Sequence, residues 1–239
     1  MSNSSSITKK NIVLLPVYGG DNPSYFRESL LSIYNQTFSS FYVYILVDGK
    51  IGAELQACLD DINDHRIECL HFPTNRGLAS VLNDGIAKGI EHNATYFIRM
   101  DADDICSANR FEEQVKFMDN HPEVGICGSF IEEIDENSQL KNKVIKYPVT
   151  SKQCFDFFNY RDPVCHPATI IRAEIFKKIG DYPTKYRLNE DSNLWAKAFY
   201  NGVLFYNIPN VLLKFRITSN LFGRRKRSAW ENLKNRFEI

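Results

Sequence analysis

Three carboxylates lie within four residues in the stretch Asp101-Ala102-Asp103-Asp104, directly after the apolar run 96–100. Ionised carboxylates this close together repel one another, and they are strongly disfavoured away from water unless something compensates their charge. A divalent cation is the simplest compensator, because Mg²⁺ and similar ions bind carboxylate oxygens. The tetrad therefore predicts one of two things: a solvated turn capped by aspartates, or a cation site that also holds a phosphorylated ligand.

The elements that must position this tetrad alternate between apolar runs and helical patterns over the first 120 residues. Runs rich in β-branched and aromatic residues predict four strands, over residues 12–17, 42–47, 67–71 and 96–100. Apolar residues at helical spacing predict three intervening helices, over residues 26–34, 55–62 and 78–90. This order of strand and helix indicates an α/β protein with a parallel, doubly wound sheet.

Beyond the tetrad the pattern becomes mixed. We expect helices over residues 111–118, over 151–159 and from Glu190, and strands over 124–131, 168–172, 203–206 and 211–215. The chain has no internal repeat and no low-complexity linker. We therefore expect one domain over 1–239 with two functional halves, at about 10–120 and about 121–220, followed by a basic amphipathic helix at about 221–239.

Three polar or turn-forming segments fall at the ends of predicted parallel strands: residues 16–18, Asp48 and residues 101–104. Ligands of open parallel sheets bind outside the carboxyl ends of the strands. Because the three segments converge on one edge of the sheet, the ligand site is favoured over the solvated turn.

Composition excludes several classes of protein. The chain carries 29 basic and 29 acidic side chains, so it lacks the positive excess typical of nucleic-acid partners. Its six cysteines show no C-x-x-C spacing, which indicates reduced, buried thiols in a cytoplasmic protein. The polar N-terminal stretch is unlike a signal peptide, and no apolar run approaches the roughly 18 residues of a membrane span.

The usual phosphate-binding loops are also missing. Gly19-Gly20-Asp21 follows the first strand but does not complete G-x-G-x-x-G, and no P-loop motif is present. This disfavours nicotinamide dehydrogenases and P-loop kinases. Without a glycine cradle, Mg²⁺ or Mn²⁺ held by Asp103, with Asp101 as a second candidate ligand, is the natural neutraliser of a diphosphate.

The chain resembles family 2 glycosyltransferases of the GT-A fold over most of its length. The matching segments are Pro16-Val17-Tyr18, residues 32–38, Val47-Asp48-Gly49, residues 75–78 and 82–85, residues 99–104, and Glu190-Asp191 before Leu194-Trp195. Each is weak alone, but their order and spacing are specific. The resemblance implies a Rossmann-like, mostly parallel central sheet flanked by helices, and metal-dependent, inverting transfer of a hexose from a UDP-sugar to a carbohydrate acceptor.

The resemblance assigns donor-binding roles to matching positions. Pro16, Val17 and Tyr18 would line the pocket for base and ribose, and Asp48 would contact the uracil or ribose. Asp48 could instead be a turn residue, since many relatives carry a second aspartate where Gly49 stands.

The remaining donor-binding roles surround the diphosphate. Arg76 would reach the diphosphate, although a solvated loop arginine is an equal alternative. Asp101, with Ala102 beside it, would lie against the ribose or the metal, and Asp103 would be the principal metal ligand. Asp104 either contacts the ligand or orients the turn.

On the acceptor side, the resemblance makes Asp191 the general base, and Glu190 the residue that holds the acceptor or the base in place. The alternative is that both carboxylates only favour a helix N-terminus. His166 would shape the acceptor pocket, and Trp195, four residues after Asp191, would form a floor on which a sugar stacks. A structural histidine and a core tryptophan are the corresponding alternatives.

Two regions modify this picture. Many relatives carry a histidine near Thr218, so the metal would have fewer protein ligands here, or Arg216 and Ser219 would contact the phosphate instead. The basic stretch 224–227, followed by apolar residues at helical spacing, fits either a helix on an anionic membrane surface or one packed on the domain. The membrane alternative implies a lipid-linked sugar acceptor, as in bacterial O-antigen and exopolysaccharide synthesis, at the cytoplasmic face of the inner membrane.

Two rival functions remain open. A nucleotidyltransferase can use a similar sheet and a metal-binding aspartate, but Gly19-Gly20-Asp21 is a poor version of its glycine-rich loop. A catalytically degenerate sugar-nucleotide-binding subunit is the second rival. The intact Asp101, Asp103 and Asp191 argue against it.

Overall fold

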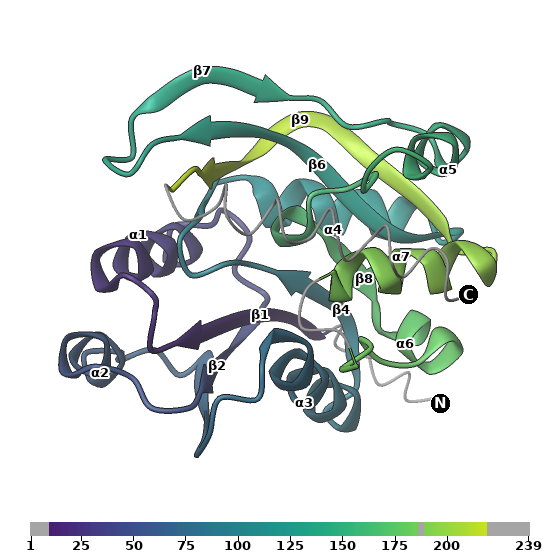
Figure 1. Ribbon diagram of the computed structural model, residues 1–239. Coiled ribbons are helices and arrows are strands. Elements are labelled where there is room, and N and C mark those ends of the chain that lie inside the picture. Colours follow the sequence, from purple (N-terminus) through teal and green to yellow (C-terminus); the bar gives the residue numbers. More distant parts are fainter. Residues whose placement is uncertain (1–9, 186–188, 219–239) are drawn as a thin grey trace, which may run out of the picture.

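The computed structural model describes residues 10–185 and 189–218, which form a curled sheet with helices on both faces (Figure 1). The strand order is β3-β2-β1-β4-β8-β6-β9-β5, and β7 pairs with β6. Within the described residues, no helix has the length and apolar character needed to cross a membrane. The predicted α/β architecture with a mostly parallel sheet is confirmed.

The first four strands are parallel and follow the predicted order. They are β1 (Lys10–Tyr18), β2 (Tyr42–Asp48), β3 (Ile67–Phe72) and β4 (Ala94–Arg99). Helices α1 (Pro23–Tyr34), α2 (Ala53–Asp60) and α3 (Leu78–Glu91) connect them. The side chains of β1 and β2 are buried on both faces, as expected for strands covered by helices on either side.

The second half adds strands in both directions. It comprises β5 (Ile105–Cys106), α4 (Arg110–Asn120), β6 (Val124–Ile134), β7 (Leu140–Ile145), α5 (Ser151–Phe158), η1 (His166–Ala168), β8 (Ile170–Arg172), α6 (Ala173–Ile179), α7 (Glu190–Tyr200) and β9 (Leu204–Arg216). Strand β8 is antiparallel to β4 and to β6, whereas β9 runs parallel to β6.

Two sequence expectations need correction here. The two late strands predicted over 203–206 and 211–215 form one continuous strand, β9. The strand predicted over 168–172 is shorter, because Ala168 belongs to the 3-10 helix η1. The elements β5, β7 and α6 were not predicted. The basic helix predicted at 221–239 lies outside the described residues.

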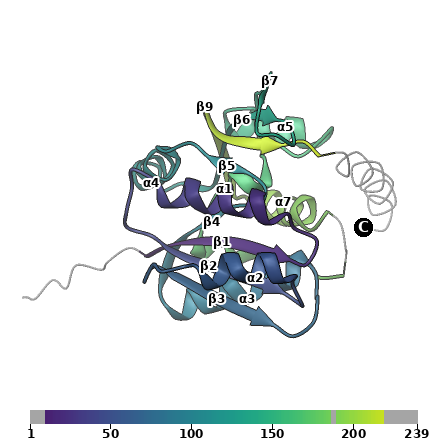
Figure 2. The same ribbon diagram turned by 90° about the vertical axis from the view of Figure 1, so that its left-hand side faces the viewer.

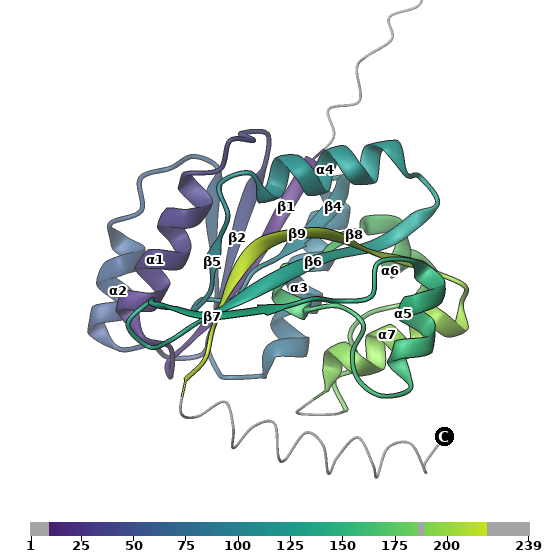
Figure 3. The same ribbon diagram turned by 90° about the horizontal axis from the view of Figure 1, so that it is seen from above.

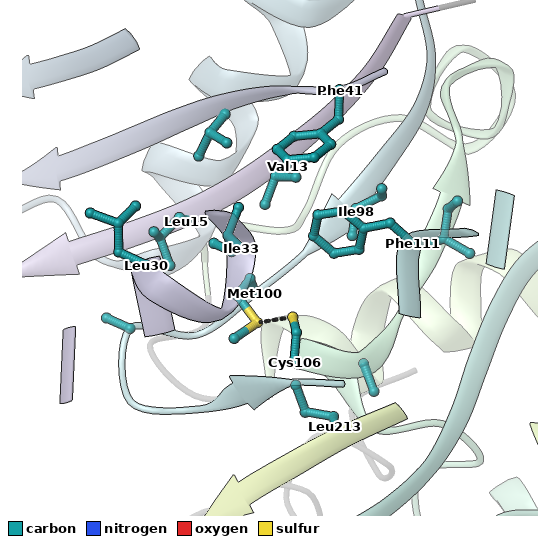
Figure 4. Packing of buried hydrophobic residues seen from close by; sticks show 14 of the residues in the cluster. Val13, Leu15, Leu30, Ile33, Phe41, Ile98, Met100, Cys106, Phe111 and Leu213 are labelled. Carbon is teal, nitrogen blue, oxygen red and sulfur yellow. Dashed lines mark hydrogen bonds between the residues drawn. The ribbon is translucent and has the colours of Figure 1, made fainter. Parts of the chain in front are cut away.

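The sheet curls so that β6, β7 and β9 pass above α1 and α4 (Figures 1 and 2). One hydrophobic core therefore lies between β1, α1, α4 and β9, and a second lies on the other face between the sheet, α3, α6 and α7. Figure 4 shows the first core, with Val13, Ile33, Phe111 and Leu213 converging.

This first core also anchors the acidic tetrad. Met100 and Cys106 flank the tetrad and are both buried. Their sulfur atoms lie 3.3 Å apart, so the chain is pinned on either side of residues 101–104 (Figure 4). The chain therefore leaves the core after Met100 and returns to it at Cys106, which places the tetrad at the sheet edge.

Candidate active site

A cavity of about 460 Å³ opens at the carboxyl ends of β1, β2 and β4. Eight of the residues predicted from the sequence line it together: Pro16, Val17, Tyr18, Asp48, Asp101, Ala102, Asp103 and Glu190. They come from three strand ends and from the start of α7. The strand-end rule of parallel sheets thus anticipated that these segments would meet at one edge of the sheet.

Asp48 is buried at the end of β2 and holds the loop that begins α3. Its Oδ1 accepts a hydrogen bond from the backbone amide of Arg76 at 2.7 Å, and its Oδ2 accepts one from the amide of Gly77 at 2.9 Å. The carboxylate therefore fixes one wall of the cavity as well as lining it. The sequence offered a turn role and a ligand contact as alternatives for Asp48. In the structure Asp48 both holds the turn and lines the cavity.

Gly49 follows Asp48 and has a conformation that favours glycine. Its φ is +84°, and a Cβ atom there would lie 2.6 Å from the backbone nitrogen of Asn75. Such a contact is too short for a larger residue. A second aspartate at this position would push the 75–78 loop away from Asp48.

Arg76 does not enter the cavity. Its guanidinium pairs with Asp84, and the guanidinium carbon lies 4.4 Å from the ring centroid of Phe72. The side chain is absent from the described lining of the cavity. In this structure the predicted contact with the diphosphate is therefore replaced by an ion pair on the surface of α3.

The acidic tetrad forms a tight group of carboxylates. One oxygen each from Asp101, Asp103 and Asp104 can be chosen so that all lie within 4.8 Å of one another. Asp104 is 1% exposed; its Oδ1 accepts a hydrogen bond from the amide of Arg216 at 2.9 Å, and its Oδ2 has no partner among the described residues. Burial, followed by the charges of Asp103 and Asp101, raises the pKa of Asp104 well above its usual value.

These observations fit a divalent cation. A buried carboxylate oxygen without a hydrogen bond is unfavourable, and two further carboxylates beside it add repulsion. A cation bound by this group would remove both penalties, and hard oxygen ligands suit Mg²⁺ or Mn²⁺. The group contains both predicted ligands, Asp103 and Asp101, and adds Asp104.

Arg99 is a central residue of the site that the sequence analysis did not single out. It ends β4, is 3% exposed, and donates a hydrogen bond from Nη2 to Oδ1 of Asp101 at 2.5 Å. Its positive charge also lowers the pKa values of Glu190 and Asp191, although burial outweighs this effect. Arg99 belongs to the matching segment 99–104. The sequence did not show that it would be buried beside Asp101 and that its charge would act on Glu190 and Asp191.

Glu190 and Asp191 form the first turn of α7. Burial, and next the charge of Asp191, raises the pKa of Glu190 to about 7. Burial also raises the pKa of Asp191, whose Oδ1 accepts a hydrogen bond from the amide of Ser192 at 2.8 Å. Glu190 lines the cavity, whereas Asp191 is not among its described lining residues. Carboxylates with pKa values raised towards neutrality are suited to accept a proton near pH 7.

A family model described as "Glycosyl transferase family 2" matches residues 12–180. The chain belongs to this family. It is a glycosyltransferase, as the resemblance predicted.

Two curated relatives of this glycosyltransferase cover most of its length. The amylovoran biosynthesis glycosyltransferase AmsE of Erwinia amylovora is 28% identical, over 95% of this chain and 83% of the relative. The UDP-Gal:alpha-D-GlcNAc-diphosphoundecaprenol beta-1,3-galactosyltransferase of Escherichia coli is 33% identical, over 92% of this chain and 79% of the relative.

A solved structure supports the fold. TarS 1–349 of S. aureus in complex with UDP-GlcNAc superposes with a TM-score of 0.69 at 17% identity. The match covers 88% of this glycosyltransferase but only 59% of the TarS chain. The GT-A fold expected from the sequence is therefore confirmed.

The two residues predicted to contact the acceptor are both buried in the glycosyltransferase. His166 is 7% exposed and its Nε2 lies 2.8 Å from the hydroxyl of Tyr182, while burial lowers the pKa of His166 well below its usual value. Trp195 is fully buried, with its ring edge-on to His166 and Phe205. The predicted sugar-stacking floor is therefore wrong, because Trp195 is a core residue. His166 packs against Trp195 inside the core.

Arg216 lines the cavity, and neighbouring side chains hold its guanidinium in place. Its Nη2 lies 2.6 Å from Oε2 of Glu28, its Nη1 donates to Oγ of Ser138 at 2.9 Å, and its guanidinium stacks over Tyr25. Thr218 does line the cavity, as its position after β9 suggested, whereas Ser219 lies outside the described residues.

Several lining residues were not anticipated. Asp21, Asn75, Leu78, Val81 and Phe215 also face the cavity. Asp21 is fixed because its Oδ2 accepts a hydrogen bond from the backbone amide of Tyr18 at 2.9 Å. Its place directly after the first predicted strand was the signal that could have identified it.

Proposed function

We propose that this glycosyltransferase transfers a hexose from a UDP-sugar to a sugar carried on a lipid diphosphate, with inversion at the anomeric carbon and with Mn²⁺ or Mg²⁺ as cofactor. The observation that carries the proposal is that one cavity is lined by the carboxylates of Asp101 and Asp103 and by Glu190 from the start of α7. A candidate donor site and one carboxylate of the Glu190–Asp191 pair thus line the same cavity.

The donor half binds and orients. Pro16, Val17 and Tyr18 hold the base and ribose, and Asp48 keeps the loop at residues 75–78 in place through its two amide hydrogen bonds. Asp101, Asp103 and Asp104 hold the metal ion, which supplies charge neutralisation for the departing diphosphate. The ion pair with Arg99 fixes the orientation of Asp101.

The acceptor half moves a proton. A carboxylate of the Glu190–Asp191 pair, with Asp191 as the assigned base, takes the proton from the acceptor hydroxyl as its oxygen attacks the anomeric carbon. The bond between that carbon and the diphosphate oxygen breaks on the opposite face, and UDP leaves with the electron pair. Burial raises the pKa of both carboxylates, that of Glu190 to about 7, which supports a proton-accepting role for the pair near neutral pH.

The donor and acceptor classes rest on the relatives. The E. coli relative is named for UDP-Gal and an undecaprenol-diphosphate-linked acceptor, and the TarS structure holds UDP-GlcNAc. A lipid-linked acceptor implies a reaction at the cytoplasmic face of the membrane. The basic segment 224–227 supports contact with anionic lipid there.

The test is a screen of UDP-sugars against short-chain sugar-diphosphate-lipid acceptors, with Mn²⁺, with Mg²⁺ and with a chelator. We expect UDP release, loss of transfer on chelation, and a product anomer opposite to that of the donor. Retention or metal-independent transfer would contradict the mechanism. Pyrophosphate release from a nucleoside triphosphate would indicate a nucleotidyltransferase, and tight UDP binding without turnover on every donor would indicate a binding subunit.

A further inference from the structure

A second depression, more open than the donor cavity, lies outside it between the end of β7 and α5. Its volume is about 570 Å³, within the usual range for small-ligand sites. The residues that matter here are Lys146, Tyr147, Asp156, Phe157 and Tyr160. We call it the α5 groove. Neither the donor site nor the proposed base uses it.

The α5 groove is linked to the catalytic cavity along its inner wall. Tyr147 is half-buried and packs against the core cluster that contains Cys165, Met100 and Ala102. The inner wall of the groove is therefore part of the same core that holds the tetrad segment.

A second link joins the groove to the proposed base. Tyr160 is followed closely by Asp162, whose Oδ1 accepts a hydrogen bond from Oγ of Ser192 at 2.7 Å. Ser192 is the neighbour of Asp191 in α7. Figures 1 and 3 show α5 beside α7, in agreement with the ring contact of Phe155 with Phe199. The chain that leaves the groove at Tyr160 is therefore hydrogen-bonded, through Asp162, to the neighbour of the proposed base.

The lining of the groove is aromatic and contains one cation, Lys146; a second cation, Arg161, directly follows Tyr160 in the chain but is outside the described lining. The side chain of Tyr160 is 85% exposed. A large aromatic side chain this exposed is often covered by a binding partner. Lys146 is exposed and makes no hydrogen bond or ion pair within residues 10–185 and 189–218. The guanidinium carbon of Arg161 lies 5.9 Å from the ring centroid of Phe157. The one acid in the lining, Asp156, pairs with Lys152 at 2.7 Å.

We propose that the α5 groove binds the diphosphate-linked end of the acceptor: Lys146 and Arg161 bind the phosphates, and Phe157 and Tyr160 contact the adjoining apolar chain. The inference rests on the proposed function, which supplies an acceptor that carries a diphosphate. Two cations suit a diphosphate, and aromatic rings suit an apolar lipid chain attached to it. The reacting sugar would then extend past Asp162 and Ser192 towards Glu190.

The test uses two acceptors that carry the same sugar, one as a short-chain lipid diphosphate and one as an alkyl glycoside without phosphate. The variants are Lys146→Met, Arg161→Met and Tyr160→Ala in the full chain. Matched controls are Lys116→Met on the exposed face of α4 and Tyr200→Ala at the exposed end of α7. UDP binding in the presence of Mn²⁺ reports whether each variant is folded.

We expect each groove variant to raise the KM for the diphosphate acceptor about tenfold or more, as for the loss of a charge-assisted hydrogen bond. The KM for the UDP-sugar should stay constant. With the alkyl glycoside, the two cation variants should behave like the unsubstituted enzyme, and the controls should change nothing with either acceptor.

Unchanged preference for the diphosphate acceptor in all three variants would overturn the groove assignment while leaving the proposed function standing. So would a loss seen only when the acceptor is embedded in anionic vesicles, since that result would mean the groove contacts the membrane. If the unsubstituted enzyme transferred sugar to neither acceptor, the proposed function itself would fail and the inference with it.

Discussion

The backbone amide of Arg216 donates a hydrogen bond to Oδ1 of Asp104 at 2.9 Å and thereby joins the end of β9 to the acidic tetrad. Nε of Arg216 also donates to the carbonyl oxygen of Asp103 at 2.8 Å. The position of the carboxylates proposed to bind the metal is thus set by a strand that lies 112 residues later in the chain. Because Thr218 lies just beyond Arg216, the same strand end brings it to the cavity wall.

Asp103→Ala should abolish both transfer and the metal-dependent part of UDP binding, because it removes a carboxylate of the group that would bind the cation. Calorimetric titration of UDP with and without Mn²⁺, together with transfer assays, measures both. Asp60→Ala at the exposed end of α2 is the control and should behave like the unsubstituted enzyme. Full activity in the Asp103 variant would contradict the proposal that Asp103 binds a metal ion needed for transfer.

Asp104→Asn should weaken metal binding but stabilise the metal-free protein at neutral pH. The native-state pKa of Asp104 is raised above its unfolded value, so its contribution to stability is highest below the unfolded pKa and is lost as pH rises through the native pKa. An asparagine keeps the Oδ1 acceptor for Arg216 and carries no charge.

Thermal unfolding of both proteins in chelator, measured from acidic to neutral pH, checks this prediction. The melting temperature of the unsubstituted protein should fall more steeply with rising pH than that of Asp104→Asn. Added Mn²⁺ should restore the melting temperature of the unsubstituted protein at neutral pH. Identical slopes would show that the buried carboxylate does not destabilise the metal-free fold.

The sequence predicted the donor half well because its signals are local. Strands β1 to β4 are buried apolar runs, and the polar residues at their ends occupy one sheet edge, so topology alone brought Asp48 and Asp101 together. The acceptor half was harder. Strand β7 is almost wholly exposed and lacks an apolar pattern, and β9 is interrupted by Asn207 and Pro209. Its continuity depends on Asn207, whose side chain donates to the carbonyl oxygens of Pro148 and Pro163.

Burial is the quantity that the sequence could not supply for the site. Trp195 lies four residues after Asp191 and so shares its helix face, but that spacing fits a core contact and a ligand contact equally. Arg99 and Arg216 resemble ordinary basic residues in the sequence, yet both are buried and hold the tetrad. In each case long-range packing decided the role.

Asp191→Asn should remove turnover while leaving UDP-sugar binding nearly intact, since the substitution removes a proton acceptor without changing side-chain volume. Initial rates and donor affinity, measured on the same preparation, separate the two effects. Normal turnover would show that Asp191 is not the base. Glu190→Gln is then the decisive companion, because Glu190 is the member of the pair that lines the cavity.

The transfer rate should fall as pH drops below about 7, the value to which burial and the charge of Asp191 raise the pKa of Glu190. Below that pH Glu190 binds a proton, which leaves the pair with one carboxylate to accept the proton of the acceptor hydroxyl and removes the negative charge of Glu190 that makes Asp191 a stronger base. The apparent pKa of the acid limb belongs to the coupled pair rather than to either residue. A pH–rate profile at saturating metal and donor measures it, and a flat profile well into the acidic range would contradict the prediction.

The same acid limb should move to higher pH in Arg99→Met, because the Arg99 charge lowers the pKa values of Glu190 and Asp191. This variant should also lose about 3–5 kcal/mol of unfolding free energy, the typical loss when one partner of a buried ion pair is removed. Arg99→Lys keeps the charge and should restore the acid limb, although not the fork geometry at Asp101. Equal acid limbs in the Met and Lys variants would show that Arg99 acts by packing alone.

Trp195→Ala should act on stability and hardly at all on the recognition of the acceptor. Trp195 is fully buried, and its Nε1 has no hydrogen-bond partner among the described residues, so the substitution removes packing and little else. Truncation of a buried tryptophan lowers the free energy of unfolding by about 3–5 kcal/mol. Denaturant unfolding measures this loss, and acceptor KM below the melting temperature should remain within about twofold of the unsubstituted enzyme, well under the tenfold that 1.4 kcal/mol represents. A large rise in acceptor KM with unchanged stability would show that Trp195 contacts the acceptor after all.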